Sequence, residues 1–314
     1  MLKEKNQRIR RQILPVLAKN IAVALEDKEL DFEGLQEIRL RAEKPLAVIY
    51  KGKEIFVAGR EEKPVIVTGR EIRETMDYIS SYSLYAYENE MRQGFITIEG
   101  GHRVGMAGQT VIEEKQVKNM KYISSVNIRI SHEVKGCATE VLPYLTKNGE
   151  LCHTLIISPP RCGKTTLLRD IVRQASDGCK WMKGTTVGVV DERSEIGGCY
   201  MGRPQNDLGI RTDILDGCPK AEGMLMLIRS MSPRILAVDE IGAAEDVQAI
   251  EYALHCGCIM LATAHGASME ELRRKPLFDA LIENRRFERY VVLSNRERTG
   301  GICGIYDERG SQVW

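Results

Sequence analysis

The stretch from residue 158 to residue 166 reads SPPRCGKTT, and it follows a short apolar run at residues 155–157. A Gly-Lys-Thr sequence directly after such a run is typical of a phosphate-binding loop, or Walker A motif, in which a strand passes through a tight turn into a helix. The backbone N–H groups of the turn and of the helix N-terminus then face the same way and form a cradle for an anion. This feature constrains the fold strongly, because it requires a strand, a loop and a helix in immediate succession.

The loop departs from the usual pattern G-x-x-x-x-G-K-[ST] at two positions. Ser158 stands where the first glycine is expected, and Arg161 lies in the middle of the loop. Serine is small enough for a tight turn, whereas a left-handed backbone at Arg161 would cost roughly 1–2 kcal/mol. Similar loops in terminator proteins of the Rho type also have a small residue first and a base fourth, so the guanidinium of Arg161 can itself touch phosphate. We therefore expect a nucleotide site made of Ser158, Pro159, Pro160, Arg161, Cys162, Gly163, Lys164, Thr165 and Thr166.

Four residues of the loop and of a later strand end have expected roles in holding and cleaving ATP. The Lys164 ammonium would reach the outer phosphates, and the Thr165 hydroxyl would bind Mg²⁺. Residues 235–238 form an apolar run that ends in the adjacent carboxylates of Asp239 and Glu240, which is the Walker B arrangement. We expect Asp239 to hold the Mg²⁺ shell and Glu240 to orient or deprotonate the attacking water.

Two further apolar runs also end in polar side chains. Residues 187–190 are followed by Asp-Glu-Arg-Ser-Glu. Because this would be a second acidic strand end in the same sheet, we favour a catalytic role for Glu192 and Glu195 over a position in a surface turn. His265 follows the run at residues 259–262. A polar side chain at the carboxyl end of such a strand can sense the terminal phosphate, although a lone histidine is more often structural.

The pattern of the chain changes near residue 135. From residue 136 onward, short apolar runs at residues 155–157, 187–190, 235–238, 259–262 and 290–293 alternate with helical segments, the first at residues 164–173. Buried strands separated by helices predict an α/β domain over residues 136–314 with a mainly parallel sheet.

Residues 1–135 mix helices and strands and predict a smaller α+β domain for regulation or oligomerisation. A basic amphipathic helix pair interrupted at Pro15 opens the chain and is expected to pack on its own domain, with docking on a membrane surface or a partner as the alternative. Thr68 and Glu71 form a capping box that opens a helix. Residues 95–98 and 103–106 flank a Gly-Gly turn and predict a hairpin, and residues 125–130 predict another strand.

Composition narrows the class of protein. Lysine and arginine together number 45 against 44 acidic residues, so the formal net charge is +1. This balance argues against binding nucleic acid over a broad basic surface. The nine cysteines are an odd number and include no Cys-x-x-Cys pair, which favours a reducing cytosol over a disulfide framework. No apolar run approaches the roughly 18 residues that a membrane-spanning helix needs.

These motifs together resemble the secretion-type ATPases of type II and type IV machines. The run at residues 227–242 is similar to their Walker B segment, with Asp239 in place of a glycine and Gly242 in place of an arginine. The acidic run at residues 191–195 is similar to their Asp box, and His265 to their His box. Within this superfamily the chain resembles a family of sporulation proteins from endospore-forming bacteria, through residues 37–42, 100–105, 191–196, 204–207 and 219–224.

The resemblance implies a RecA-like P-loop core with ATP and Mg²⁺ as cofactors. It also implies a cytoplasmic ATPase of the mother cell that assembles into a hexameric ring. This ring would drive a channel complex by binding the membrane proteins of that complex. Nucleotide would then lie between subunits. The resemblance implies that arginines from a neighbouring subunit reach the phosphates. The candidates are Arg39, Arg41, Arg103 and Arg129 in the N-terminal domain, and Arg211 and Arg229 nearer the loop in sequence.

Two other functions remain open at this stage. A Rho- or RecA-like nucleic-acid motor would share the core, but it would favour basic loops interleaved with aromatic residues, and the chain has five Phe and two Trp. No nucleic acid is therefore expected as a partner. A nucleotide-gated scaffold without useful turnover is the other alternative, because Ser158 and Arg161 alter the loop.

Overall fold

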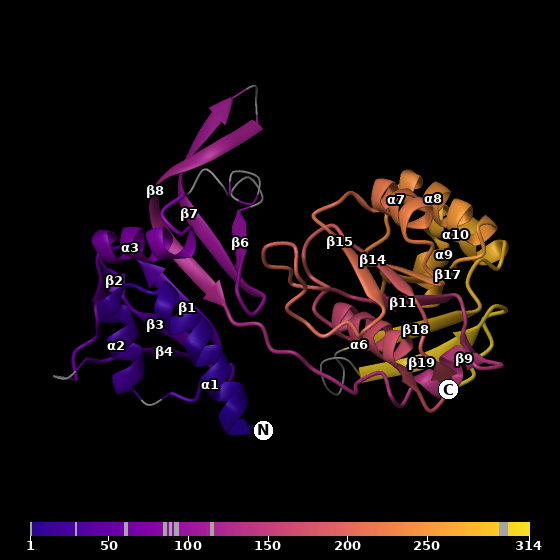
Figure 1. Cartoon of the computed structure of the whole chain (residues 1–314), viewed down its shortest axis with the longest axis horizontal. Helices are drawn as coiled ribbons and strands as arrows, with labels where there is room; N and C mark the ends of the chain where they lie inside the picture. The colour runs from indigo at the N-terminus through magenta and orange to yellow at the C-terminus, as the bar shows by residue number, and fades with distance from the viewer. Residues whose placement is uncertain are drawn as a thin grey trace. The chain divides into compact units, whose positions relative to one another are not determined.

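The computed structural model describes residues 2–28, 30–59, 62–83, 87, 90, 94–113, 116–294 and 301–314. The chain divides into two compact units, Met1–His132 and Glu133–Trp314 (Figure 1). Each unit has its own hydrophobic core and its own main sheet.

The first unit is built on a six-stranded antiparallel sheet with the order β4-β3-β1-β8-β7-β6. Its strands are β1 (Leu35–Arg41), β3 (Ala47–Tyr50), β4 (Lys53–Phe56), β6 (Phe95–Ile98), β7 (His102–Glu113) and β8 (Gln116–Arg129), with the small pair β2 (Lys44–Pro45) and β5 (Ile66–Val67) beside them. The hairpin predicted around Gly100 and Gly101 is confirmed as the β6–β7 turn, because Ile98 pairs with His102. The strand predicted at residues 125–130 is confirmed as the end of β8.

The helices of this unit pack on one face of that sheet. Those with bounds among the described residues are α1 (Leu2–Ile13), the 3-10 turn η1 (Leu14–Val16), α2 (Lys19–Asp27) and α3 (Gly69–Ile79). The capping box is confirmed, since Thr68 Oγ1 accepts a bond from the Glu71 amide at 3.2 Å and Glu71 Oε2 accepts one from the Thr68 amide at 2.8 Å. Apolar side chains of α1, α2 and α3 form one core with those of β1, β7 and β8, so the N-terminal helix pair packs on its own unit, as expected.

The second unit contains a seven-stranded sheet with the order β15-β14-β16-β17-β11-β18-β19. All neighbouring pairs are parallel except β18 with β19. The strands are β11 (Thr154–Ser158), β14 (Val187–Asp191), β15 (Thr212–Asp216), β16 (Ile235–Val238), β17 (Ile259–His265), β18 (Arg289–Ser294) and β19 (Gly301–Asp307). The α/β fold with a mainly parallel sheet is therefore confirmed, and each apolar run predicted as a strand lies in one of these strands.

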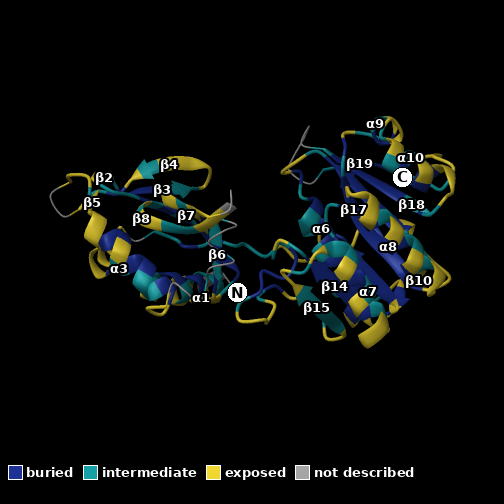
Figure 2. Cartoon of the chain, turned by 90° about the horizontal axis from the view of Figure 1, so that it is seen from above, coloured by how far each residue is buried: buried dark blue, intermediate teal, exposed yellow. Residues whose placement is uncertain are grey.

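Helices cover both faces of this sheet. They are α5 (Leu142–Leu145), α6 (Lys164–Asp177), α7 (Lys220–Ser230), α8 (Ala244–His255), α9 (Met269–Arg273) and α10 (Pro276–Glu283). Helix α6 joins one core through Leu168 and Ile171, whereas α7, α8 and α10 join the core on the other face. Figure 2 shows β14 and β17 in the dark blue of buried residues, between helices whose outer sides are exposed.

Two short hairpins precede strands of this sheet: β9 (Thr146–Lys147) with β10 (Glu150–Leu151), and β12 (Gly178–Cys179) with β13 (Met182–Lys183). The parallel strands place their carboxyl ends at one edge, where the loops after β11, β14, β16 and β17 come together. Among the described residues, no helix is both long and apolar enough to cross a bilayer.

Candidate functional site

The loop between β11 and α6 forms a tight turn into the helix. Gly163 is the N-cap of α6 and has a φ of 83°, and Arg161 has a φ of 62°. Arg161 therefore has a left-handed backbone conformation, which is unfavourable for a residue other than glycine. Its side chain is exposed. Ser158 is fully buried, and its hydroxyl donates to the carbonyl of Pro159 at 2.9 Å. A small side chain at position 158 thus fits the turn without a glycine.

The ammonium group of Lys164 lies in a cluster of charged groups. Its side chain is 6% exposed, and Nζ donates to Oε1 of Glu240 at 2.7 Å. His265 Nε2 lies 2.9 Å from the same oxygen, and Arg193 donates to Oε2 of Glu240 at 3.1 Å. Burial alone would raise the pKa of Glu240, but the bond and charge of Lys164, with the nearby His265 and Arg193, lower this pKa below its ordinary value. The Glu240 carboxylate is therefore held in its charged form at neutral pH.

Asp239 lies beside the first hydroxyl of the helix. Thr165 Oγ1 donates to Oδ2 of Asp239 at 2.5 Å, and the Thr263 hydroxyl donates to Oδ1. Burial raises the pKa of Asp239, and these two bonds oppose that shift. A hydroxyl and a carboxylate are hard oxygen ligands of the kind that Mg²⁺ accepts together with nucleotide phosphates. The donor set of Thr165 and Asp239 therefore fits Mg²⁺.

The acidic loop after β14 is held by Asp191. Its carboxylate is 1% exposed and accepts bonds from the backbone N–H groups of Glu195 at 2.8 Å, Ile196 at 3.0 Å and Gly197 at 2.7 Å. Burial raises the pKa of Asp191 to about 6, against the opposing effect of these bonds. Arg169, on α6, donates to the carbonyls of Ile196 at 2.7 Å and Glu195 at 2.6 Å. The loop is thus fixed from both sides, by its own aspartate and by the helix that begins at Lys164.

The acidic loop and the end of β16 enclose a cavity of about 360 Å³. Glu192 in this cavity forms an ion pair with Lys220 at the start of α7. Glu195 and Arg193 also line the cavity, opposite Asp239 and Glu240. The structure therefore brings the sequence candidates Lys164, Thr165, Glu192, Glu195, Asp239, Glu240 and His265 to one edge of the sheet.

Arg211 and Arg229 lie away from this cluster within the chain, and their expected role at the phosphates of a neighbouring subunit stays a prediction. Arg211 donates to the carbonyl of Ser176 at 2.8 Å, at the end of α6 opposite Lys164. Arg229 lies in the last turn of α7, which leads into the beginning of β16 rather than its carboxyl end. Both residues precede a parallel strand, so they lie at the amino-end edge of the sheet.

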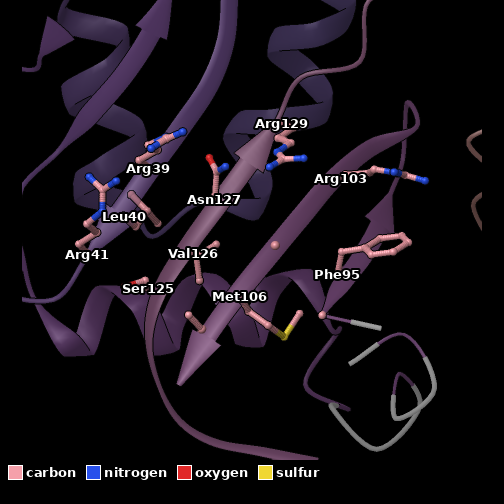
Figure 3. Close-up of a pocket in the computed structure, with 13 residues that line it drawn as sticks. Arg39, Leu40, Arg41, Phe95, Arg103, Met106, Ser125, Val126, Asn127 and Arg129 are labelled. Atoms are coloured by element: carbon pink, nitrogen blue, oxygen red, sulfur yellow. The ribbon is translucent and has the colours of Figure 1, made fainter. Parts of the chain in front are cut away.

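Four arginines of the N-terminal unit lie on the sheet face away from the helices. Side chains alternate along a strand, so Ile38 and Leu40 enter the core while Arg39 and Arg41 point to the open face. A cavity of about 430 Å³ on this face is lined by Arg39, Arg41, Phe95, Arg103, Asn127 and Arg129, among others (Figure 3).

Arg103 and Arg129 are direct cross-strand partners on this open face. Like charges at such positions repel one another. Glu37 offsets part of this charge, because it lies 2.6 Å from Arg39 and 3.8 Å from Arg129. Arg103 also lies over the Phe95 ring, 4.5 Å from its centroid. The open face is therefore suited to an anion.

Sequence reasoning assigned no role to three residues of the site: Arg169, Arg193 and Thr263. Thr263 lies within β17 between two alanines, and its hydroxyl accepts a bond from the Glu240 amide at 2.8 Å. Arg169 gave no local signal, because it bonds to the loop after β14 through the tertiary fold. Arg193 lies within the acidic run, where the sequence drew attention to the carboxylates on either side of it.

The fold is similar to the folds of two solved structures, the ATPase DotB and the pilus retraction motor PilT. The structure superimposes on the ATPase DotB from Legionella pneumophila with a TM-score of 0.56 and 15% identity, covering 93% of this chain and 81% of that one. It superimposes on the pilus retraction motor PilT with bound ADP with a TM-score of 0.59 and 14% identity, covering 86% and 77%. At these identities the likeness concerns the fold alone.

The sequence places the chain more narrowly. The family model described as sporulation stage III, protein AA matches residues 7–313. The stage III sporulation protein AA of Bacillus subtilis is 43% identical over 302 residues, which cover 96% of this chain and 95% of that protein. The chain therefore belongs to the sporulation stage III protein AA family, which confirms the resemblance noted in its motifs.

Proposed function

We propose that the protein binds and hydrolyses ATP with Mg²⁺ and acts as the motor of a secretion-type channel complex in endospore formation. One observation carries the proposal: three loops bring Lys164, Thr165, Asp239, Glu240 and His265 within hydrogen-bond distance of one another. These groups are the ones that a P-loop ATPase needs at the phosphates.

The residues divide the chemistry between them. The backbone of the loop and Lys164 hold the phosphates, while Thr165 and Asp239 hold Mg²⁺, which neutralises charge on the phosphate oxygens when it is bound. Glu240 orients or deprotonates the attacking water once its carboxylate leaves Lys164. His265, beside Glu240, senses the terminal phosphate, and Glu192 and Glu195 complete the polar wall of the cavity.

The ring of subunits supplies the remaining groups. In this proposal a second copy of the chain approaches the nucleotide, and the arginines of its open sheet face neutralise phosphate charge. The support is the concentration of Arg39, Arg41, Arg103 and Arg129 on one face, with Arg103 opposite Arg129. Any role of Arg211 or Arg229 at phosphates also requires a second copy, because each lies at the other edge of its own sheet. Membrane proteins of the channel complex are the expected partners of the ring, and the cytoplasm of the mother cell is its location.

The test is Mg²⁺-dependent release of phosphate from ATP, measured against oligomer size for the wild type, Lys164→Ala and Glu240→Gln. We expect turnover in the oligomeric wild type and its loss in both variants. ATP that binds but is not cleaved in a single turnover would indicate a nucleotide-gated scaffold. Stimulation by single-stranded RNA or DNA would indicate a nucleic-acid motor instead.

A further inference from the structure

The Glu240 carboxylate is surrounded by basic groups from three segments at the carboxyl-end edge of the sheet. Lys164 lies at 2.7 Å and His265 at 2.9 Å from Oε1, and Arg193 lies at 3.1 Å from Oε2. Lys164 follows β11, Arg193 follows β14 and His265 ends β17. A carboxylate with donors on both of its oxygens occupies an anion site that the fold has assembled around it.

The backbone at Glu240 directs the side chain into this site. Its φ is 55°, a left-handed conformation that residues with a Cβ rarely adopt. The Glu240 amide donates to Thr263 Oγ1 at 2.8 Å, which fixes the turn after β16. This backbone turn places the Glu240 carboxylate beside Lys164. The ion pair is therefore built into the local fold and is not a chance contact of an exposed side chain.

The identity of Lys164 indicates which anion the site is built for. In a P-loop this lysine reaches the outer phosphates, so an anion bonded to its ammonium group stands where a phosphate oxygen would stand. We propose that the Glu240 carboxylate occupies the place of the terminal phosphate, and that Arg193 is a ligand of that phosphate from the same chain. This inference rests on the proposed function and assigns a phosphate contact within one subunit, in addition to any from a neighbour.

Arg193 has the access and the chemistry for this contact. Its side chain is 65% exposed and lines the cavity that Asp239 and Glu240 also line. A guanidinium can bind two phosphate oxygens at once, and such charge-assisted bonds are stronger than neutral ones. Arg169 lies on α6 instead, and its guanidinium donates to the backbone carbonyls of Ile196 and Glu195.

Replacement of the Glu240 carboxylate by the terminal phosphate would also prepare the site for hydrolysis. A terminal phosphate carries more negative charge than a carboxylate, so it competes for Lys164 and Arg193 and releases Glu240 toward the attacking water. ADP lacks that phosphate and leaves Glu240 bonded to Arg193. Arg193 should therefore contribute to binding of a triphosphate and contribute little to binding of a diphosphate.

The test is calorimetric titration with Mg²⁺ and either ADP or the β,γ-imido analogue of ATP, which is not hydrolysed. The proteins are the wild type, Arg193→Gln, Arg193→Lys and, as a matched control, Arg203→Gln, which changes an exposed arginine further along the same connection. We expect Arg193→Gln to weaken binding of the imido analogue about 10- to 100-fold. ADP binding should stay within about twofold, Arg193→Lys should fall between, and Arg203→Gln should match the wild type.

Equal effects of Arg193→Gln on both nucleotides, or an effect on neither, would overturn the inference while leaving the proposed function intact. Failure of the proposed function has a different signature: the wild type binds neither nucleotide, or Lys164→Ala binds both as well as the wild type. Thermal unfolding of each variant shows that it is folded, and Arg193→Lys retains the charge if Arg193→Gln is unstable.

Discussion

Strands β14 and β16 are neighbours in the sheet and both lead into aspartates, but the two carboxylates have different partners. Asp191 accepts bonds from three backbone N–H groups of its own loop, whereas Asp239 accepts bonds from the hydroxyls of Thr165 and Thr263. Backbone donors are fixed once the loop has folded, whereas a hydroxyl can rotate and offer its lone pairs to a cation. An aspartate bonded to backbone N–H groups at a strand end therefore stabilises a loop, whereas one bonded to hydroxyls can still bind a cation.

The glutamates that follow these aspartates show the same contrast. Glu192 pairs with Lys220, which belongs to the neighbouring helix, whereas Glu240 pairs with the lysine of the phosphate-binding loop. Only the second pairing is broken by a phosphate group that arrives at the loop. We therefore propose the water-activating role for Glu240 and a supporting role for Glu192.

The largest predicted effect separates these two glutamates. Glu240→Gln removes the carboxylate that activates water, so turnover should fall about 10²- to 10⁴-fold. ATP should bind and persist, and should bind more tightly than to the wild type, because Lys164 loses its competing anion. Glu192→Gln, measured by phosphate release in the same assay, should lower turnover less than about tenfold. Normal turnover in Glu240→Gln with an inactive Glu192→Gln or Glu195→Gln would move the catalytic carboxylate to the acidic loop.

The next effect separates the two aspartates. Asp191→Asn should reduce the free energy of unfolding by about 1–3 kcal/mol, because the amide NH₂ group cannot accept from a backbone N–H and leaves a buried donor unpaired. Asp239→Asn should change stability less and should abolish the Mg²⁺ dependence of nucleotide binding. Denaturant unfolding and titrations with and without Mg²⁺ measure both quantities. Similar profiles for the two variants would remove the distinction between loop-building and chemical carboxylates.

A smaller effect is the pH dependence of stability that Asp191 confers. Its pKa of about 6 in the folded chain lies above the ordinary aspartate value of 3.8, so the folded state binds more protons through this group than the unfolded state does. Its stabilising contribution is thus full below the unfolded pKa and is lost as pH rises through the folded pKa. The stability difference between wild type and Asp191→Asn should be larger at about pH 4.5 than at about pH 7.5, by about 2 kcal/mol. A difference that does not vary with pH would contradict the raised pKa.

The smallest effect concerns the two unusual residues of the phosphate-binding loop. Arg161→Gly relieves a left-handed backbone that costs roughly 1–2 kcal/mol, but it also removes a charge close to the phosphates. We expect the loss of charge to prevail, so ATP binding should weaken a few-fold (about 2- to 5-fold) at low salt and less at high salt. Ser158→Gly and the double variant serve as comparisons in the same titrations. Tighter binding by Arg161→Gly, independent of salt, would show that the arginine is only tolerated.

Much of the second unit follows from local sequence, because its strands are short apolar runs that end in recognisable polar groups. Strands β15 and β19 were not predicted, since they lie at the two edges of the sheet and lack a continuous buried run. Thr212–Asp216 is half-buried along most of its length, so its pattern resembles that of a loop. In the first unit, the capping box and the Gly-Gly turn were predictable because each depends on residues close in sequence.

The site was predictable where one residue type has one chemical role, as with Lys164 and the paired Asp239 and Glu240. Partners that depend on the tertiary fold were not predictable. Arg169 reaches its carbonyls only because α6 packs against the loop after β14, and no spacing in the sequence encodes that contact. Arg211 is close to the phosphate-binding loop in sequence but not in space. Lys164 begins α6, whereas Arg211 bonds to the other end of this helix.

The most direct measurement is the affinity of Mg²⁺-ATP for the wild type and for Lys164→Ala, determined by calorimetry on the full chain. Lys183→Ala is the matched control, because it removes an exposed lysine of β13, which precedes β14 rather than following it. We predict that the wild type and Lys183→Ala bind with equal affinity and that Lys164→Ala binds at least about 100-fold more weakly with its fold intact. Equal affinity in Lys164→Ala and the wild type would contradict the assignment of this loop as the nucleotide site.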